Sequence, residues 1–337
     1  MMMEIVKRPH AQNFVNWAKD KPEVVVLTAD LTGSCEADAF RSAYPERYFA
    51  MGIAEQNMLS WAAGLAKEGF EPYIHTFAVF IYRQAFHQME VSIAYPNLPV
   101  KMMGFLPGIL TPGGMTHQAT DDLALVCAVP NMTVLECGDA TEVQSVLDVA
   151  HQVQGPVYVR MLRGEVPRIF PESEPMQLGK SRILSTGDDV TVITSGICTE
   201  EALRVTKLLG EKGVGIQHVH ISTLKPFDDP AVVEAIQRSK FGVISMENHT
   251  VLGGLGTAVA EVIAAQGLNK RLVKIGLQDV FAHGASRPYL VKKYGLDAMS
   301  LVRAIESLMG TSFGIHEEAL SSVHLTPVHS QAKVEAL

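Results

Sequence analysis

Short apolar runs alternate with amphipathic segments along most of the chain. Residues 24–27 are continuously apolar, as in a parallel strand that is buried on both faces. Further along, Met58, Trp61, Ala62 and Leu65 are spaced three and four residues apart, which predicts a helix that buries this face. Repetition of the strand-and-helix alternation predicts an α/β protein built on parallel sheets.

The alternation forms two blocks, and the stretch between them carries three prolines that interrupt regular structure. The predicted strands are residues 24–27, 72–77, 100–105, 133–137, 157–160, 190–195, 215–221, 242–246 and 273–277. The predicted helices include residues 11–19, 78–95, 119–128, 141–152, 200–212, 230–238 and 299–309. The predicted division is a domain at 1–165, a linker at 166–184, a second domain at 185–310 and a tail at 311–337. We expect both domains to be doubly wound and the polar tail to be mobile.

Composition narrows the class of protein. The chain has 337 residues, 47% of them hydrophobic and 19% charged, which is enough for two globular cores. A net charge of −8 argues against a general nucleic-acid binder, which needs a basic surface. No apolar run reaches the roughly 18 residues of a membrane span, and residues 1–10 lack the apolar core of a signal peptide. The four cysteines lack C-x-x-C spacing, so we predict neither a zinc site nor a disulfide framework, and we expect a cytoplasmic location.

Candidate chemistry begins where a strand turns into a helix. Gly52 marks the turn and Glu55 lies in the first helical turn, at the mouth of a sheet where α/β folds place ligand sites. Alone, a carboxylate at this position is more often an exposed residue that the helix dipole favours. The glycine-rich stretch 253–256 lacks the spacing and the downstream acid of a dinucleotide site, so it predicts a tight turn before a helix.

Four motifs in order change the interpretation of Glu55. They are Asp30-Leu-Thr-Gly-Ser34, Gly52-Ile-Ala-Glu-Gln-Asn-Met58, Thr76-Phe77 with Phe80, and Thr116-His-Gln118. Over about residues 5–310 the chain resembles the C-terminal half of the transketolase family, and the glutamate motif is close to that of deoxyxylulose-phosphate synthases. The resemblance implies a parallel-sheet domain that binds the pyrimidine ring of thiamine diphosphate, followed by a smaller transketolase C-terminal domain.

The resemblance implies a role for each cofactor-facing residue. Glu55 would bind a ring nitrogen of the pyrimidine and activate the cofactor. Phe80, with Phe77 beside it, would supply a flat apolar pocket. Asp30 would lie near the thiazolium ring, and His117 would face both cofactor and substrate and assist proton movement. Ordinary structural roles stay open for these residues: core for the phenylalanines, a turn or helix cap for Asp30, and a solvated loop for His117.

Other matches concern the substrate. Arg160 matches an arginine that binds the terminal phosphate, Ser34 a hydroxyl near the same group, and Arg8 a second arginine after a one-residue gap. For Arg160 the alternative is a surface ion pair. Transketolases carry a histidine where this chain has Phe105 and an aspartate where it has Gly113, and both contact sugar hydroxyls. We therefore expect lost polar contacts, freed space and a different sugar specificity.

One motif of the family is missing from the sequence. There is no Gly-Asp-Gly motif with a downstream asparagine, which in the family holds Mg²⁺ and the diphosphate. The resemblance therefore implies a separately encoded subunit that holds these groups, an α2β2 assembly, and no metal site in this chain. It implies transfer of a two-carbon ketol unit between sugar phosphates.

Two alternatives to this activity stay open. One is the E1 β subunit of a 2-oxoacid dehydrogenase, against which the Thr-His-Gln loop argues. The other is a non-catalytic regulatory paralogue, against which the presence of Glu55 argues. The stretch Glu247-Asn-His249 receives no catalytic role in any of these interpretations.

Overall fold

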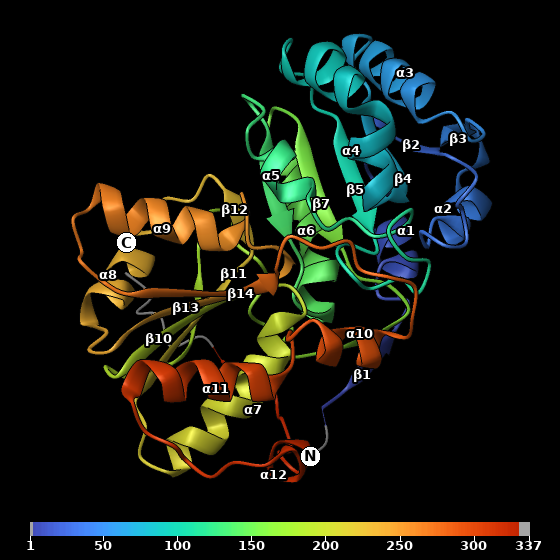
Figure 1. Cartoon of the computed structure of the whole chain (residues 1–337). Coiled ribbons are helices and arrows are strands. Elements are labelled where there is room, and N and C mark those ends of the chain that lie inside the picture. The colour runs from blue at the N-terminus through green and yellow to red at the C-terminus, as the bar shows by residue number, and fades with distance from the viewer. Residues whose placement is uncertain (1–2, 330–337) are drawn as a thin grey trace.

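The chain forms two α/β domains, as Figure 1 shows in blue to green for the first and yellow to red for the second. The computed structural model describes residues 3–329. Each domain is built on a mostly parallel sheet with helices packed on it. The predicted doubly wound α/β class is therefore confirmed. Among the described residues, no helix has the length and apolar character needed to cross a bilayer.

The first domain contains a seven-stranded sheet with the order β12-β6-β7-β5-β4-β2-β3. Its parallel strands are β2 (Val24–Thr28), β3 (Tyr48–Ala50), β4 (Glu71–Phe77), β5 (Lys101–Phe105), β6 (Thr133–Glu136) and β7 (Val157–Met161). All residues of β2, β4, β5, β6 and β7 are buried, as expected for parallel strands that are covered on both faces.

The helices of this domain lie between successive parallel strands, except that the first precedes β2. They are α1 (Ala11–Trp17), α2 (Asp38–Ala43), α3 (Glu55–Lys67), α4 (Ala78–His87), α5 (Asp122–Val126) and α6 (Ala140–Gln152), with a short 3-10 helix η1 (Pro45–Arg47). The predicted helix at 78–95 is divided, because Ala85 has non-helical backbone angles and the π-helix η2 (Gln88–Ala94) follows α4.

The second domain is built on a five-stranded sheet with the order β14-β13-β10-β11-β9. Its strands are β9 (Arg182–Ser185), β10 (Val190–Ser195), β11 (Ile216–Ile221), β13 (Gly242–Thr250) and β14 (Leu272–Leu277), of which only β9 is antiparallel to its neighbour. Its helices are α7 (Cys198–Glu211), α8 (Pro230–Arg238), α9 (Leu255–Ala265), α10 (Arg287–Lys293), α11 (Ala298–Met309) and α12 (Glu317–Ser321).

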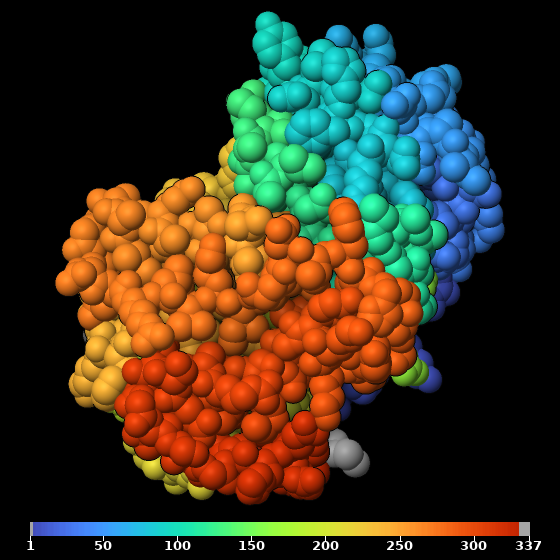
Figure 2. All heavy atoms as spheres, in the orientation of Figure 1, coloured from blue at the N-terminus to red at the C-terminus, as the bar shows by residue number. Residues whose placement is uncertain are grey.

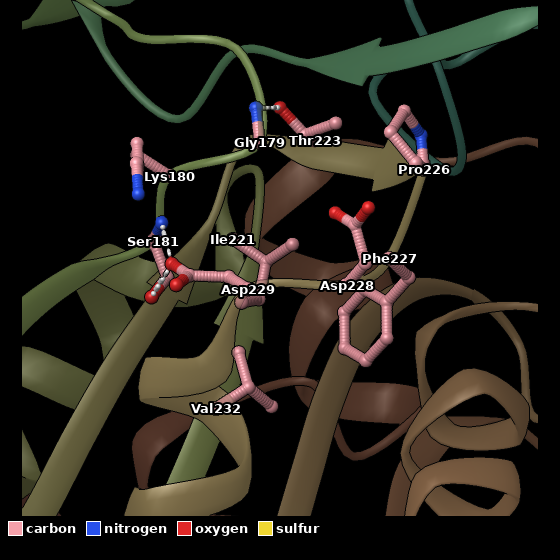
Figure 3. Close-up of a pocket in the computed structure, with 10 residues that line it drawn as sticks. All are labelled: Gly179, Lys180, Ser181, Ile221, Thr223, Pro226, Phe227, Asp228, Asp229 and Val232. Atoms are coloured by element: carbon pink, nitrogen blue, oxygen red, sulfur yellow. Dashed lines mark hydrogen bonds between the residues drawn. The ribbon is translucent and has the colours of Figure 1, made fainter.

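One strand from the sequence of the second domain joins the sheet of the first. β12 (Thr223–Lys225) lies within the sequence of the second domain but pairs antiparallel with β6 at the edge of the first sheet. The proline-rich linker is fastened at the same place, because Gly179 N donates to Thr223 Oγ1 at 3.0 Å and Ser181 N donates to Asp229 Oδ2 at 2.7 Å. Figure 3 shows these bonds and the small pocket between them. The linker is therefore packed against both domains.

The ends of the described chain are also bound. A short ribbon pairs β1 (Ile5–Lys7) with β8 (Glu165–Pro167), so part of the predicted linker is a strand. Residues 311–329 contradict the predicted mobile tail: Leu320 and Leu325 are buried, and Val328 N donates to Ile169 O at 2.8 Å. The rest of the predicted tail, residues 330–337, lies outside the described residues.

Candidate active site

The predicted site residues follow the carboxyl ends of neighbouring parallel strands. Asp30 comes after β2, Glu55 after β3 and His117 after β5, while Phe77 ends β4. Because β2 pairs with β3 and β4, and β4 pairs with β5, these strand ends form one edge of the sheet. This is the edge at which open α/β sheets bind ligands.

Three of these side chains form an aromatic cluster. The rings of Phe77 and Phe80 are stacked, with centroids 5.8 Å apart and an interplanar angle of 20°. His117 meets Phe80 edge-on at 5.5 Å and Phe77 at 6.4 Å. Thr116 Oγ1 lies 2.9 Å from His117 Nδ1, so this bond helps to fix the ring orientation of the histidine. The cluster combines a flat apolar surface with one titratable group.

Glu55 is the first residue of α3, as the turn at Gly52 predicts. Its side chain is only 8% exposed, so it is not the exposed helix-start glutamate of the simpler interpretation. The N-terminal turn of a helix favours a carboxylate, but a buried carboxyl group also requires a polar partner. A second buried polar group lies near the end of β4, where the hydroxyl oxygen Thr76 Oγ1 has no hydrogen-bond partner among the described residues.

Asp30 occupies a turn and does not begin a helix. Its φ of 57° lies in the left-handed region and its side chain is exposed. The next helix, α2, begins only at Asp38, so the alternative of a cap for that helix does not describe its position. The turn instead places Asp30 at the solvent-facing side of the same sheet edge.

Two arginines, Arg8 and Arg163, lie on the loops beside this edge of the sheet. Arg163 Nη1 donates to Ser34 O at 2.8 Å, and Arg8 N donates to Gly164 O at 2.6 Å. The buried carboxylate of Glu36 joins these segments, since its two oxygens accept from Gly164 N and from the backbone N–H of residue 10. The pKa of Glu36 is raised by burial. The Arg8 side chain remains half-exposed and pairs with Asp38.

Arg160 lies elsewhere than its predicted role requires. It is inside β7 with no exposed surface, and its guanidinium bonds Asp122 at 2.9 Å and Glu136 at 2.5 Å. Burial alone lowers the pKa of Arg160, but these two carboxylates outweigh it and raise the pKa. Nη2 also donates to Asn248 O of the second domain at 3.0 Å. A side chain in this position cannot reach a ligand without leaving the ion-pair network, so the structure argues against the predicted phosphate contact.

Arg163, which the sequence analysis did not consider, is an arginine beyond the same strand end. Strand β7 runs through Met161, and Gly164 turns the chain with a φ of 77°. Arg163 therefore lies beyond the strand end and is partly exposed, whereas Arg160 lies before it. The glycine directly after Arg163 is the sequence signal that could have identified the strand end.

Of the two positions that differ from transketolases, one is buried and the other is exposed but lies against His117. Phe105 is fully buried and its ring packs on His75 at 5.9 Å and on His10 at 5.6 Å. A Cβ atom at Gly113 would lie 2.8 Å from Cγ of His117. The expectation of freed space at position 113 is therefore wrong, because the histidine ring occupies it.

The glycine-rich turn before α9 is occupied by a carboxyl group of the protein itself, that of Glu247. Glu247 Oε2 accepts from Leu255 N at 2.7 Å and Oε1 accepts from Gly256 N at 2.9 Å. Burial raises the pKa of Glu247 to about 7. Since the protein's own carboxyl group occupies the helix N-terminus, the interpretation of residues 253–256 as a tight turn is confirmed and a phosphate cradle is excluded.

A separate group of possible metal ligands lies at the opposite ends of the strands. Among the described residues, Glu23, Glu71 and His151 place one ligand atom each within 4.8 Å of one another. However, Glu71 is already paired with His151 at 2.6 Å and with the buried Lys101 at 3.7 Å. We interpret this group as an ion-pair network.

Comparison with known proteins agrees with this architecture. Residues 10–168 match the family described as "Transketolase, pyrimidine binding domain", and residues 179–301 match "Transketolase, C-terminal domain". A protein of Methanocaldococcus jannaschii named as a transketolase C-terminal section is 38% identical over 303 residues, covering 89% of this chain and 95% of that protein. The 6-deoxy-6-sulfo-D-fructose transketolase subunit SqwH of Clostridium sp. (strain MSTE9) is 36% identical over 291 residues, covering 86% of this chain and 90% of that protein.

A solved structure described as "Split gene transketolase, inactive beta4 tetramer" superimposes with a TM-score of 0.81 at 38% identity, covering 90% of this chain and 97% of that one. Fold, domain order and coverage thus agree, and the chain belongs to the transketolase family, as a β-type subunit that resembles the C-terminal half of the complete enzyme.

Proposed function

We propose that this chain is the β subunit of a split transketolase-like enzyme that depends on thiamine diphosphate. It transfers a two-carbon ketol unit from a ketose phosphate to an aldose phosphate. The observation that carries the proposal is the cluster of Phe77, Phe80 and His117 at the same sheet edge as the buried Glu55. A separately encoded subunit supplies the Gly-Asp-Gly motif that holds Mg²⁺ and the diphosphate.

The residues present fit the pyrimidine end of the cofactor. A planar, nitrogen-containing ring needs an apolar face and a few polar groups at its rim, and the stacked phenylalanines and the buried Glu55 offer these. Thr76 Oγ1 adds a buried hydroxyl without a partner among the described residues. Phe80 would hold the ring face, Glu55 would bond a ring nitrogen, and Asp30 would approach the other ring. The bound cofactor supplies the electron sink for cleaving a carbon–carbon bond beside a carbonyl.

The chain's own residues would then position the substrate and move protons. His117 lies beside the aromatic surface with its Nδ1 on Thr116, which leaves Nε2 to exchange a proton with a substrate hydroxyl. Arg163 and Arg8 would bind the terminal phosphate in place of Arg160, with Ser34 beside them. Both arginines lie on loops at the sheet edge and keep partly exposed guanidinium groups.

The experiment that tests the proposal is Glu55→Gln in the complex with the partner subunit. Removing the proton-sharing carboxyl group should lower kcat with a ketose phosphate donor by on the order of 10²-fold or more. Activity that survives within about tenfold, some 1.4 kcal/mol of barrier, would remove Glu55 from the mechanism. Glu68→Gln, at the other end of α3, is the matched control and should leave kcat unchanged.

The choice of donor separates the alternatives. The proposal expects turnover with a ketose phosphate and none with a 2-oxoacid plus lipoamide. The opposite result would establish the E1 β function, and no turnover with either donor in a properly assembled complex would favour the regulatory paralogue. A partner gene that encodes Gly-Asp-Gly and a downstream asparagine identifies the subunit to use.

A further inference from the structure

Residues 106–120, here called the histidine loop, carry His117 without regular structure of their own. The base of the loop is closed by Gly108 N, which donates to Ala119 O at 2.8 Å. Inside it, His117 N donates to Gly114 O at 2.9 Å and Gln118 Nε2 donates to Thr111 O at 3.1 Å. Further short-range bonds join Gly113 to Thr111 and to Thr116, but the loop contains no helix or strand, so contacts from outside it also help to hold one conformation.

The base of the histidine loop is bound by a side chain of the second domain. Asn248, on β13, is 1% exposed. Its Oδ1 accepts from Ile109 N at 3.0 Å and its Nδ2 donates to Pro107 O at 3.1 Å. The amide therefore bonds the backbone on both sides of Gly108, as a neighbouring strand would. Gly108 has a φ of +60°, and a Cβ there would lie 2.2 Å from Asn248 Cγ, so the close approach requires glycine.

Other contacts from the second domain surround the same loop. Thr250 N donates to Thr120 O at 2.8 Å, at the end of the loop. Near its tip, Gln118 Nε2 lies 3.4 Å from His283 O, and a Cβ at Gly284 would lie 2.7 Å from the carbonyl oxygen of residue 112. In Figure 2 the orange atoms of the second domain lie directly against the green atoms of the first. The loop is thus part of the boundary between the domains.

We propose that Asn248 is a positioning residue for His117. By fixing both backbone neighbours of Gly108, it sets the path of the histidine loop and so keeps the His117 ring against Phe80. The inference rests on the proposed function, because it assumes that His117 acts on the substrate. The inference gives the second domain a part in the reaction. It also assigns a role to Asn248 within the stretch Glu247-Asn-His249, which had none.

The size of the expected effect follows from the need for alignment. A displacement of about 1 Å of a catalytic group can cost on the order of 10²-fold in rate. Asn248→Ala removes both bonds to the loop and leaves the Arg160 bond to the main-chain oxygen of residue 248 available. In the assembled complex, kcat should fall by about tenfold to a hundredfold while KM for the donor stays within about twofold.

Two further variants separate positioning from general damage. Asn248→Asp keeps the acceptor for Ile109 N but faces Pro107 O with a carboxylate oxygen instead of a donor, so it should lower kcat. Its unfolding temperature is measured as well, because a buried carboxylate also costs stability. Asn13→Ala is the control, because the Asn13 amide also donates to a main-chain oxygen, 2.8 Å away in a part-buried position, but from α1. It should leave kcat unchanged.

A double-mutant cycle gives the decisive comparison. If Asn248 acts through His117, Asn248→Ala should cost less than about twofold in a His117→Ala background, because the group it positions is already gone. An equal loss in both backgrounds, or wild-type kcat in both Asn248 variants, would overturn the inference.

Hydrogen exchange of the full chain tests the contact without any assay of activity. Asn248→Ala should speed amide exchange across the histidine loop, including Ile109, whereas Asn13→Ala should not. Unchanged exchange in Asn248→Ala would overturn the inference even if activity fell. If His117→Ala alone kept full activity, the proposed role of His117 would fail, and faster loop exchange would still identify Asn248 as the residue that orders the loop.

Discussion

At the residue scale, the contact between position 113 and His117 limits which side chains can stand beside the aromatic cluster. The ideal Cβ position of residue 113 lies 2.8 Å from Cγ and 2.9 Å from Cβ of His117. Because carbon atoms do not approach so closely, any side chain at this position must move the histidine. The absence of an aspartate here is therefore coupled to where the histidine lies, and it does not free space beside the ring.

We expect Gly113→Ala to lower kcat by about tenfold, because the added methyl group displaces the His117 ring from Phe80. Steady-state kinetics of the assembled complex provide the measurement. Gly210→Ala is the control, since a Cβ at Gly210 on α7 meets nothing within 4 Å. A Gly113→Ala enzyme with wild-type kcat would show that the ring position is not used in the reaction.

The two arginines at the end of β7 should respond differently to the same substitution. Arg163→Met should raise KM for a phosphorylated donor by about tenfold with a smaller change in kcat, because it removes one charged phosphate contact. It should affect an unphosphorylated ketose much less. Arg160→Met should instead destabilise the fold by about 3–5 kcal/mol, since it leaves Asp122 and Glu136 buried without their cation. Equal KM effects from both variants would contradict this assignment.

The sequence could not separate these arginines, for a physical reason. An apolar run predicts where a parallel strand lies, but not whether an arginine near its end is before or after the last buried residue. The ion-pair partners of Arg160 are 38 and 24 residues away in sequence, so only the fold brings them together. By contrast, the turn at Gly52 and the helix starting at Glu55 depend on local chemistry, and they were predictable.

At the scale of elements, helix α3 shows both the strength and the limit of periodicity. Its start and the burial of Met58 and Ala62 follow the predicted pattern, but Trp61 is 50% exposed. Val91 and Tyr95 are also exposed, on and just after η2, which packs against α3. Spacing identifies an apolar helix face, but it cannot say whether that face is covered within the chain or by another molecule.

We expect Trp61→Glu to weaken the complex with the partner subunit by at least tenfold, about 1.4 kcal/mol. Under the proposed function the partner reaches the cofactor at Glu55, and the exposed Trp61 lies on the same helix. Sedimentation velocity of the mixed subunits measures the loss. Leu178→Glu, another exposed apolar position, is the control. Unchanged assembly of the Trp61 variant would place the contact elsewhere.

The long buried strands were predictable because parallel strands covered on both faces are continuous apolar runs. The elements that were missed are short or depend on distant partners. β12 has only three residues and pairs with β6, which lies almost ninety residues earlier in the chain. The helix α10 has seven residues and only one buried side chain, Leu290, so it carries almost no apolar pattern.

At the scale of the whole molecule, the two domains share more contacts than a proline-rich linker alone would predict. β12 completes the first sheet from the second domain, Arg160 bonds the main chain of Asn248, and Asn248 bonds the histidine loop. Because each contact is buried, separating the domains would expose unpaired polar groups and charges. The two domains should therefore move as one unit, and a fragment that contains the first domain alone should not keep the histidine loop in place.

Buried neutral histidines give the whole molecule a predictable sensitivity to acid. Burial lowers the pKa of His75 and His249 to about 4 and of His218 to about 3, and it lowers the pKa of His10 as well. The unfolded chain takes up protons near pH 6.5, but the folded chain does not. The contribution of these groups to stability is therefore complete above pH 6.5 and is lost as pH falls toward 4, by up to about 3 kcal/mol each for His75 and His249. Glu247 acts in the opposite direction, because its raised pKa of about 7 removes stability as pH rises from 4.5.

His218→Gln isolates one of these groups in the second domain. His218 is fully buried and bonds Thr194 Oγ1 at 2.9 Å, so a neutral amide can replace the neutral ring at some cost in packing. Between pH 7 and pH 4 the variant should bind roughly one proton fewer on unfolding, which flattens the pH dependence of its urea midpoint. His87→Gln, at an exposed position on α4, should leave that dependence unchanged. Parallel pH curves for wild type and His218→Gln would show that His218 is charged in the folded protein, and the acid sensitivity would then have to arise from other groups.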